Sequence, residues 1–230
     1  MKPHVICLMA ASVDGRTLPS RWRPSAKQLG LFERLHESLN GDAWLIGRVT
    51  GSEYAKRDAY PDSIKQTFPR ESWITKPNAG AYGIVLDAHG KIAWGRADIG
   101  GDPIVVVLSE TVSDAHLAGL RSDGVSYIFA GEKELDLRMA LEVLNRELGI
   151  KRILLEGGGV ANGAFLRAGL VDELSLAIYP VVDGAKGAPS VFDSPEVVTG
   201  ASAQVKQMTL ESSEVLEGGV VCLRYNLEAG

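Results

Sequence analysis

The chain has 230 residues, of which 45% are hydrophobic and 23% charged, and its formal net charge at pH 7 is −5. This composition is ordinary for a soluble globular protein, and the length allows one large domain or two small ones. Because the sequence contains no block of basic residues, it indicates neither nucleic acid nor an anionic membrane surface as a partner. No apolar run approaches the about 20 residues of a membrane-spanning helix.

The cysteines and histidines suggest neither a disulfide nor a metal site. Cys7 and Cys222 lie in separate apolar runs, which predicts two buried thiols in a reducing compartment such as the cytoplasm. The histidines show no metal-ligand spacing. The apolar stretch at the N-terminus is only about seven residues long and is followed by an acidic turn, so it predicts a first strand and not a signal peptide.

The first half of the chain starts with that strand at residues 4–10. Ser25 and Gln28 fit a capping box, which predicts a helix that ends at Gly41. Residues 42–46 form a short apolar run typical of a buried strand. The polar, proline-containing stretch 54–81 predicts mostly loop.

The next segments alternate between strand and helix patterns. Strands are predicted at residues 82–87, 103–109, 124–130 and 151–155, and a short helix at 113–120. A longer helix is predicted after Asp136, which is a suitable N-cap, and Gly149 is its stop signal. Alternation of this kind predicts an α/β fold with a largely parallel sheet.

The pattern changes near the C-terminus. Residues 171–180 alternate between apolar and polar, as antiparallel strands do, and residues 202–227 read as two strands joined by a connection that ends in Gly218-Gly219. The sequence therefore predicts a mixed, mainly parallel sheet flanked by helices and finished by an antiparallel hairpin. Since no repeat or low-complexity linker interrupts it, we expect one domain over residues 1–230.

A glycine-rich turn is the strongest functional signal. In "ILLEGGGVANGAFLRAGLVDEL" (residues 153–174) a strand ends in three glycines and a helix follows, which is how a protein presents backbone N–H groups to a phosphate. A tight turn without ligand is the alternative interpretation. The dinucleotide fingerprint G-x-G-x-x-G is not matched, because Asn162 stands where its last glycine would be.

Three further features point to a ligand. Glu156 ends a buried strand, where a carboxylate would face the crevice in which α/β sheets bind ligands, although it also fits a solvated charge. The stretch "AASVDGRTLPSRW" (10–22) is long for a turn and suggests an active-site loop. In "DAWLIGRVTGSEY" (42–54), glycines after a buried strand offer a second close approach of backbone to a ligand.

Together these segments resemble the reductase domain of bacterial riboflavin biosynthesis, which shares the dihydrofolate reductase-like fold. The motifs that carry the resemblance are "EGGGVANGAFLRAGLVDEL", "SVDG" and "DAWLIG" followed by Thr50. The resemblance implies a homodimeric, NADPH-dependent oxidoreductase that transfers hydride to the ring-opened imine of 5-amino-6-(5-phosphoribosylamino)uracil or a related heterocycle.

The resemblance also implies roles for individual residues. Asp14 and Glu156 are the acidic candidates for catalysis, because a carboxylate would favour the developing iminium. Cofactor contacts are implied for residues of all three segments: Ser20, Trp22, Gly47, Thr50, Gly157, Gly158, Gly159, Val160, Ala161, Asn162, Gly163 and Ala164.

Two positions depart from the family pattern. Tyr54 stands where many members have an aspartate, and Ala88 stands where a serine follows "VLD". The motifs that the resemblance assigns to the cofactor thus match the family more closely than those it assigns to the substrate. Two alternatives follow: a dihydrofolate reductase-like enzyme with a different substrate, and a non-catalytic NADP-binding protein.

Overall fold

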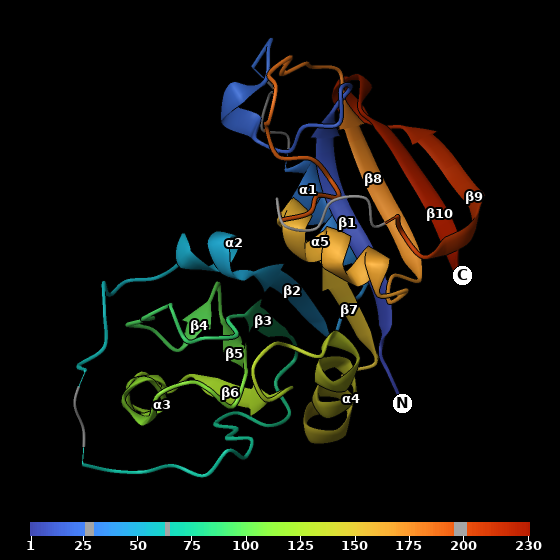
Figure 1. Ribbon diagram of the computed structural model, residues 1–230. Coiled ribbons are helices and arrows are strands. Elements are labelled where there is room, and N and C mark those ends of the chain that lie inside the picture. The colour runs from blue at the N-terminus through green and yellow to red at the C-terminus, as the bar shows by residue number, and fades with distance from the viewer. Residues whose placement is uncertain (26–29, 63–64, 196–201) are drawn as a thin grey trace. The chain divides into compact units, whose positions relative to one another are not determined.

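The computed structural model describes residues 1–25, 30–62, 65–195 and 202–230. The chain divides into two compact units (Figure 1). The first unit consists of Met1–Pro3 and Asp42–Ile153, and the second of His4–Gly41 and Leu154–Gly230. Strand β7 (Arg152–Leu155) contains the division point. The expectation of a single domain stays a prediction.

The first unit is built on a parallel sheet, as the alternating sequence pattern predicted. Its strands are β2 (Ala43–Gly47), β3 (Tyr82–Leu86), β5 (Asp102–Leu108) and β6 (Ser126–Phe129), and each pairs in parallel with the next in this order. These strands are nearly continuous runs of buried residues, as is usual when both faces of a sheet are covered. A two-residue strand, β4 (Asp98–Ile99), pairs antiparallel with β5 and was not predicted.

The long helix of this unit follows its local sequence signals closely. Helix α4 (Leu137–Leu148) begins where the Asp136 carboxylate accepts a hydrogen bond from the Met139 backbone N–H at 2.9 Å. It ends at Gly149, whose φ of 69° is the left-handed conformation of a glycine cap. Helix α3 (Asp114–Ser122) is capped in the same way by Ser113.

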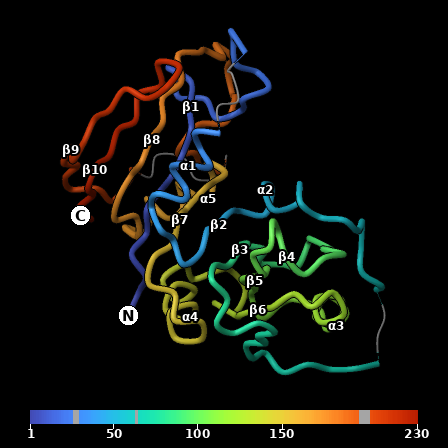
Figure 2. The backbone as a smooth tube through the Cα atoms, turned by 180° about the vertical axis from the view of Figure 1, so that it is seen from behind, coloured from blue at the N-terminus to red at the C-terminus, as the bar shows by residue number. Residues whose placement is uncertain are grey.

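The polar stretch after α2 (Arg48–Ser52) forms neither helix nor strand among its described residues, as predicted. Figure 2 shows it running round the outside of β4, β6 and α3. Within this stretch, Trp73 packs on β6 of the sheet. Its ring stacks on Tyr127 at 5.9 Å between centroids, and its backbone N–H donates a hydrogen bond to the Tyr127 carbonyl.

The second unit contains the mixed part of the fold. Strand β1 (His4–Ser12) pairs in parallel with β8 (Glu173–Tyr179). On its other edge β8 pairs antiparallel with β10 (Val221–Ala229), which forms the predicted C-terminal hairpin with β9 (Val205–Val215). The alternation in β8 thus predicted only one of its two neighbours, because alternation reports which face is buried and not the direction of the adjoining strand.

The helices of the second unit are α1 (Leu31–Ser38) and α5 (Gly159–Arg167). The N-cap of α1 is Gly30 and not Ser25, and Gln28 of the expected capping box lies outside the described residues. An apolar cluster joins α1 to β8 and to the segments around it: Trp22, Leu31, Ala177, Tyr179, Val181 and Val220. Among the described residues, no helix is long and apolar enough to cross a membrane.

Candidate active site

Glu156 directly follows β7, and its carboxylate is largely buried. Its side chain is only 12% exposed, and its Oε1 lies 2.6 Å from Nδ1 of His36 on α1. Burial raises the pKa of Glu156, whereas the hydrogen bond and the charge of His36 lower it. A solvated strand-end charge, the alternative interpretation, is therefore wrong for this residue.

Cys7 of β1 lies close enough to Glu156 to respond to its charge. Burial raises the pKa of the Cys7 thiol far above its ordinary value, and the Glu156 carboxylate raises it further. The thiol therefore stays protonated at neutral pH and is neither a nucleophile nor a proton source.

The glycine turn leads from β7 directly into α5. Gly157 has a φ of 106°, which favours glycine, and the peptide bond to Gly158 is cis. Gly158 is the N-cap of α5 and provides no side-chain cap, so the first-turn N–H groups of the helix receive no capping hydrogen bond from it. Val160, in that first turn, is half exposed. Such a helix start can accept an anion.

The later glycines of the turn have a packing role. A Cβ on Gly159 would lie 2.2 Å from the Ser190 carbonyl oxygen, and one on Gly163 would lie 1.9 Å from that of Asp193. Asn162 is fully buried and donates from Nδ2 to the Val191 carbonyl. The segment 190–193 therefore rests directly on α5, which accounts for these three residues without a ligand.

Asp14 holds the loop after β1 in place. Its carboxylate accepts hydrogen bonds from Ser12 Oγ at 2.6 Å, from the Gly184 N–H at 2.8 Å and from the Asp183 N–H at 3.1 Å. These bonds, led by that of Ser12, keep the pKa of Asp14 well below its usual range. Because this carboxylate is engaged in holding the loop, Glu156 is the stronger catalytic candidate.

Trp22 and Ser20 have different environments. Trp22 is 2% exposed, its ring centroid lies 5.3 Å from that of Tyr179, and its Nε1 donates to the Arg16 carbonyl. It is thus a core residue of the second unit. Ser20 is exposed in the short helix η1 (Pro19–Arg21).

The remaining predicted contacts, Gly47 and Thr50, belong to the first unit. Gly47 is the N-cap of α2, and Thr50 lies within that helix. The neighbouring Gly51 is required for packing, because a Cβ there would lie 2.6 Å from Cγ1 of Val85.

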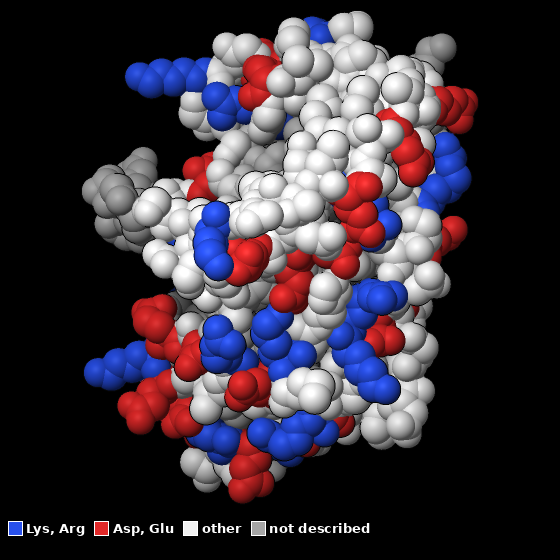
Figure 3. Space-filling model, turned by 90° about the vertical axis from the view of Figure 1, so that its right-hand side faces the viewer, with Lys and Arg blue, Asp and Glu red and all other residues white. Residues whose placement is uncertain are grey.

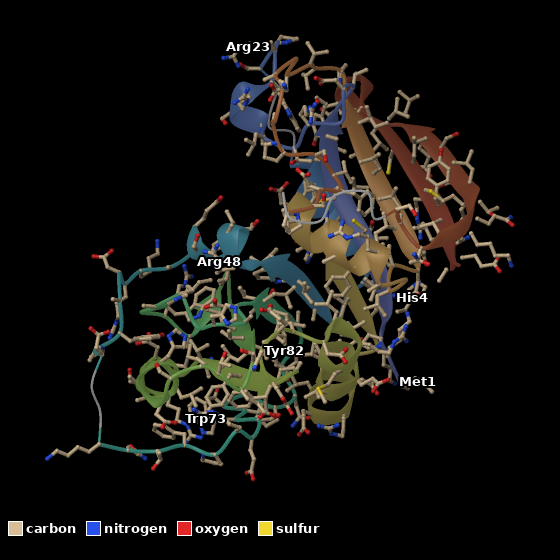
Figure 4. All side chains as sticks on the ribbon, in the orientation of Figure 1. Met1, His4, Arg23, Arg48, Trp73 and Tyr82 are labelled. Atoms are coloured by element: carbon tan, nitrogen blue, oxygen red, sulfur yellow. The ribbon has the colours of Figure 1, made fainter. Side chains whose placement is uncertain are left out.

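A pocket of about 550 Å³ lies where β2 and β3 end. Its lining consists of Arg48, Leu86, Asp87, Ala88, His89, Lys91 and Leu135. Figure 4 labels Arg48 at the start of α2. The sequence patterns did not single out these basic residues. The signal available was their position directly after two predicted strands, since parallel strands end at one edge of a sheet.

Asp87 is the buried acid of this pocket. Its Oδ2 accepts the N–H groups of Lys91 and Ile92 at 2.7 and 2.9 Å. Burial raises the pKa of Asp87, and those two hydrogen bonds and the charges of Arg48 and His89 oppose the shift. Within the described ranges, no group of acidic, histidine and cysteine side chains could hold a metal ion.

Comparisons with known proteins agree with the predicted resemblance. The family model described as RibD C-terminal domain matches residues 3–222. A protein of Archaeoglobus fulgidus named 2,5-diamino-6-ribosylamino-4(3H)-pyrimidinone 5′-phosphate reductase is 32% identical over 240 residues, which cover 98% of this chain and 100% of that protein. A protein of the same name from Methanothermobacter thermautotrophicus is 27% identical over 210 residues, covering 88% of this chain and 89% of that protein.

The fold has a solved counterpart as well. The structure of a pyrimidine reductase-like protein from Corynebacterium diphtheriae has a TM-score of 0.71 at 20% identity and covers 99% of this chain and 93% of that one. The comparisons confirm the mixed α/β fold and the oxidoreductase class that the sequence predicted.

The hydrogen bonds of Asp14 give a first prediction, concerning stability against pH. Because its pKa is lowered on folding, Asp14 stabilises the folded state above the unfolded value of 3.8, and this contribution is lost as the pH falls below it. We expect Asp14→Asn to have a lower urea midpoint than the wild type at pH 7 and a progressively smaller deficit between pH 4 and pH 3. A deficit that stays constant over this range would contradict the assignment.

Proposed function

Because the chain belongs to the RibD C-terminal domain family, we propose that it is an NADPH-dependent reductase of a pyrimidine that carries a ribosylamino 5′-phosphate group. The observation that carries the proposal is the buried carboxylate of Glu156 next to the open helix start at Gly158. A carboxylate suits a substrate that becomes cationic, and a helix start suits a phosphate.

The proposed reaction opens the ribose ring to an imine and reduces it to a ribitylamino group. The imine carbon gains a hydride and its nitrogen gains a proton, so one N–H and one C–H bond form as the C=N double bond becomes single. Bound NADPH supplies the hydride. Glu156 would stabilise the protonated imine electrostatically and orient it through a charge-assisted hydrogen bond.

The relatives' names favour one pyrimidine over another. The Archaeoglobus and Methanothermobacter proteins are named for a 2,5-diamino-pyrimidinone, whereas the bacterial resemblance implied a uracil. The two compounds differ in whether an amino group or a carbonyl oxygen occupies the carbon between the ring nitrogens. We take the diaminopyrimidinone as the primary substrate.

The substrate is tested by direct assay. We expect NADPH oxidation with 2,5-diamino-6-ribosylamino-4(3H)-pyrimidinone 5′-phosphate to proceed at a higher kcat/KM than with the corresponding uracil or with dihydrofolate, and mass spectrometry to show a product two mass units heavier, as addition of a hydride and a proton requires. Preference for dihydrofolate would favour the different-substrate alternative. NADPH binding without turnover of any of the three would favour the non-catalytic alternative.

The choice of NADPH over NADH is supported by the pocket at the ends of β2 and β3. Arg48, His89 and Lys91 line it, and a phosphate monoester is the group that a cluster of basic side chains recognises best. The 2′-phosphate distinguishes NADPH from NADH. We assign the 2′-phosphate to this pocket.

Replacing one of these basic residues should change cofactor selectivity. We expect Arg48→Gln to raise the Kd of NADPH at least tenfold, or about 1.4 kcal/mol, and to leave that of NADH within a factor of two. Arg138→Gln, the same change at an exposed position of α4, is the matched control. Calorimetric titration of both cofactors measures the ratio, and equal weakening of both would place the 2′-phosphate elsewhere.

We also propose a homodimer formed through the C-terminal hairpin. Directly paired residues of antiparallel strands share a sheet face, and one face of this hairpin carries Val215, Leu210 and Met208 opposite Val221, Tyr225 and Leu227. The three on β9 are 47–79% exposed. Figure 3 looks onto the side where β9 and β10 lie, and uncharged surface dominates its upper part. An apolar sheet face of this kind usually marks a protein interface.

A charge on this face should dissociate the dimer. We expect the wild type to elute as a dimer in light-scattering chromatography at micromolar concentration and Leu210→Glu to shift it to the monomer, since an unpaired carboxylate would be buried at the interface. Thr209→Glu, on the opposite face of the same strand, should stay dimeric. A monomeric wild type would refute this assignment.

We further propose a cytoplasmic location, which the two unbridged buried cysteines favour.

A further inference from the structure

His36 contacts the acidic candidate of the active site, although its sequence pattern gave it no role. We propose, building on the reductase function above, that His36 is the positioning residue for Glu156: its protonated ring keeps the carboxylate ionised and oriented, so that the reduction rate follows the charge on this histidine. The Nδ1–Oε1 distance of 2.6 Å is that of a short hydrogen bond, which is charge-assisted when the ring is protonated.

Because Glu156 is largely buried, its negative charge needs a partner such as His36. With 12% of its side chain exposed, Glu156 has little water to stabilise its charge, and desolvation by itself favours the protonated acid. A protonated Glu156 would bring no negative charge to an iminium. The hydrogen bond and the charge of His36 lower the pKa of Glu156 against the larger effect of burial, and so favour the ionised form that an iminium needs.

The position of His36 favours its charged form. It lies in the last turn of α1, where the partial negative charge of the helix end stabilises a cation, and a third of its side chain reaches solvent. The ring can therefore exchange protons with water while Nδ1 holds the carboxylate.

In the described part of the chain, the other ionisable groups near the pair have different partners. Cys7, facing Glu156 from β1, is a neutral thiol. Glu33 and Arg34 belong to α1 itself and act on the buried Tyr179 of β8, and Arg34 also pairs with Glu217 at 3.4 Å. Within the described residues, the ion pair observed at the Glu156 carboxylate is the one with His36.

Two substitutions at His36 separate charge from shape. In His36→Gln the side chain keeps a donor but has no charge, and we expect kcat to fall at least tenfold with an unchanged Kd for NADPH. His36→Arg keeps a cation at every pH, so it should recover most of the neutral-pH rate and lose the alkaline fall in kcat that deprotonation of His36 gives the wild type. A wild-type kcat in the glutamine variant, or an unchanged alkaline fall in the arginine variant, would overturn the proposal.

A double variant tests whether the two residues act as one. We expect Glu156→Gln to lower kcat by roughly 10²-fold, the usual scale for a positioned charged group, and the double variant with His36→Gln to be no slower than Glu156→Gln alone. Losses that multiply would mean that His36 acts independently of Glu156. The control is His4→Gln: His4 also lies 2.6 Å from a carboxylate, that of Glu173, and its loss should leave kcat and its pH profile unchanged.

A readout that needs no turnover separates this proposal from the proposed function. The imidazole NMR signals of His36 should change their titration midpoint by about one pH unit when Glu156 becomes Gln, because a nearby carboxylate favours the imidazolium. An unmoved midpoint would refute the pairing even in an active enzyme. A moved midpoint in an enzyme inactive on both pyrimidines would refute the proposed substrates and leave the pairing intact.

Discussion

A carboxylate buried at the end of a strand has to be paired, and the second unit is arranged around that requirement. Glu156 leaves β7 with little access to water, and α1 brings the imidazole of His36 to it. For this the helix must be held firmly in place. The cluster of Trp22, Leu31 and Tyr179 does so by packing α1 against β8. The burial of Trp22 therefore contributes to the site through α1.

The glycines after Glu156 have two different roles, one in backbone conformation and one in packing. Their number and spacing in the sequence do not show which glycine has which role. Gly157 supplies a positive φ where the chain leaves the strand, and Gly158 opens the helix without a side-chain cap. Gly159 and Gly163 instead provide the room in which the backbone of residues 190–193 lies on α5. The helix start, our proposed phosphate site, is thus supported from one side by a packed segment that gives it a rigid base.

The departures from the family pattern concern the other unit. Ala88 has no hydroxyl to offer a phosphate, but Arg48 and Lys91 bring positive charge to the pocket that it lines, which is our proposed site for the 2′-phosphate. Charge can replace a hydroxyl in phosphate recognition because it acts over a longer distance and needs less exact geometry. Tyr54, two residues after α2, has its ring 6.4 Å from that of Trp44 between centroids.

The sequence by itself determined the elements whose signals are local. Helix α4 could be predicted because Asp136, the leucine spacing and Gly149 all act within that helix, and the glycine turn could be located because its letters are adjacent. Which distant residues hydrogen-bond to one another was decided by the tertiary structure alone. Glu156 and His36 are 120 residues apart, and Asp14 and Gly184 are 170 apart. Hydrophobic periodicity specifies which face of an element is buried but not which distant polar atom it meets, because that depends on how the packed elements align.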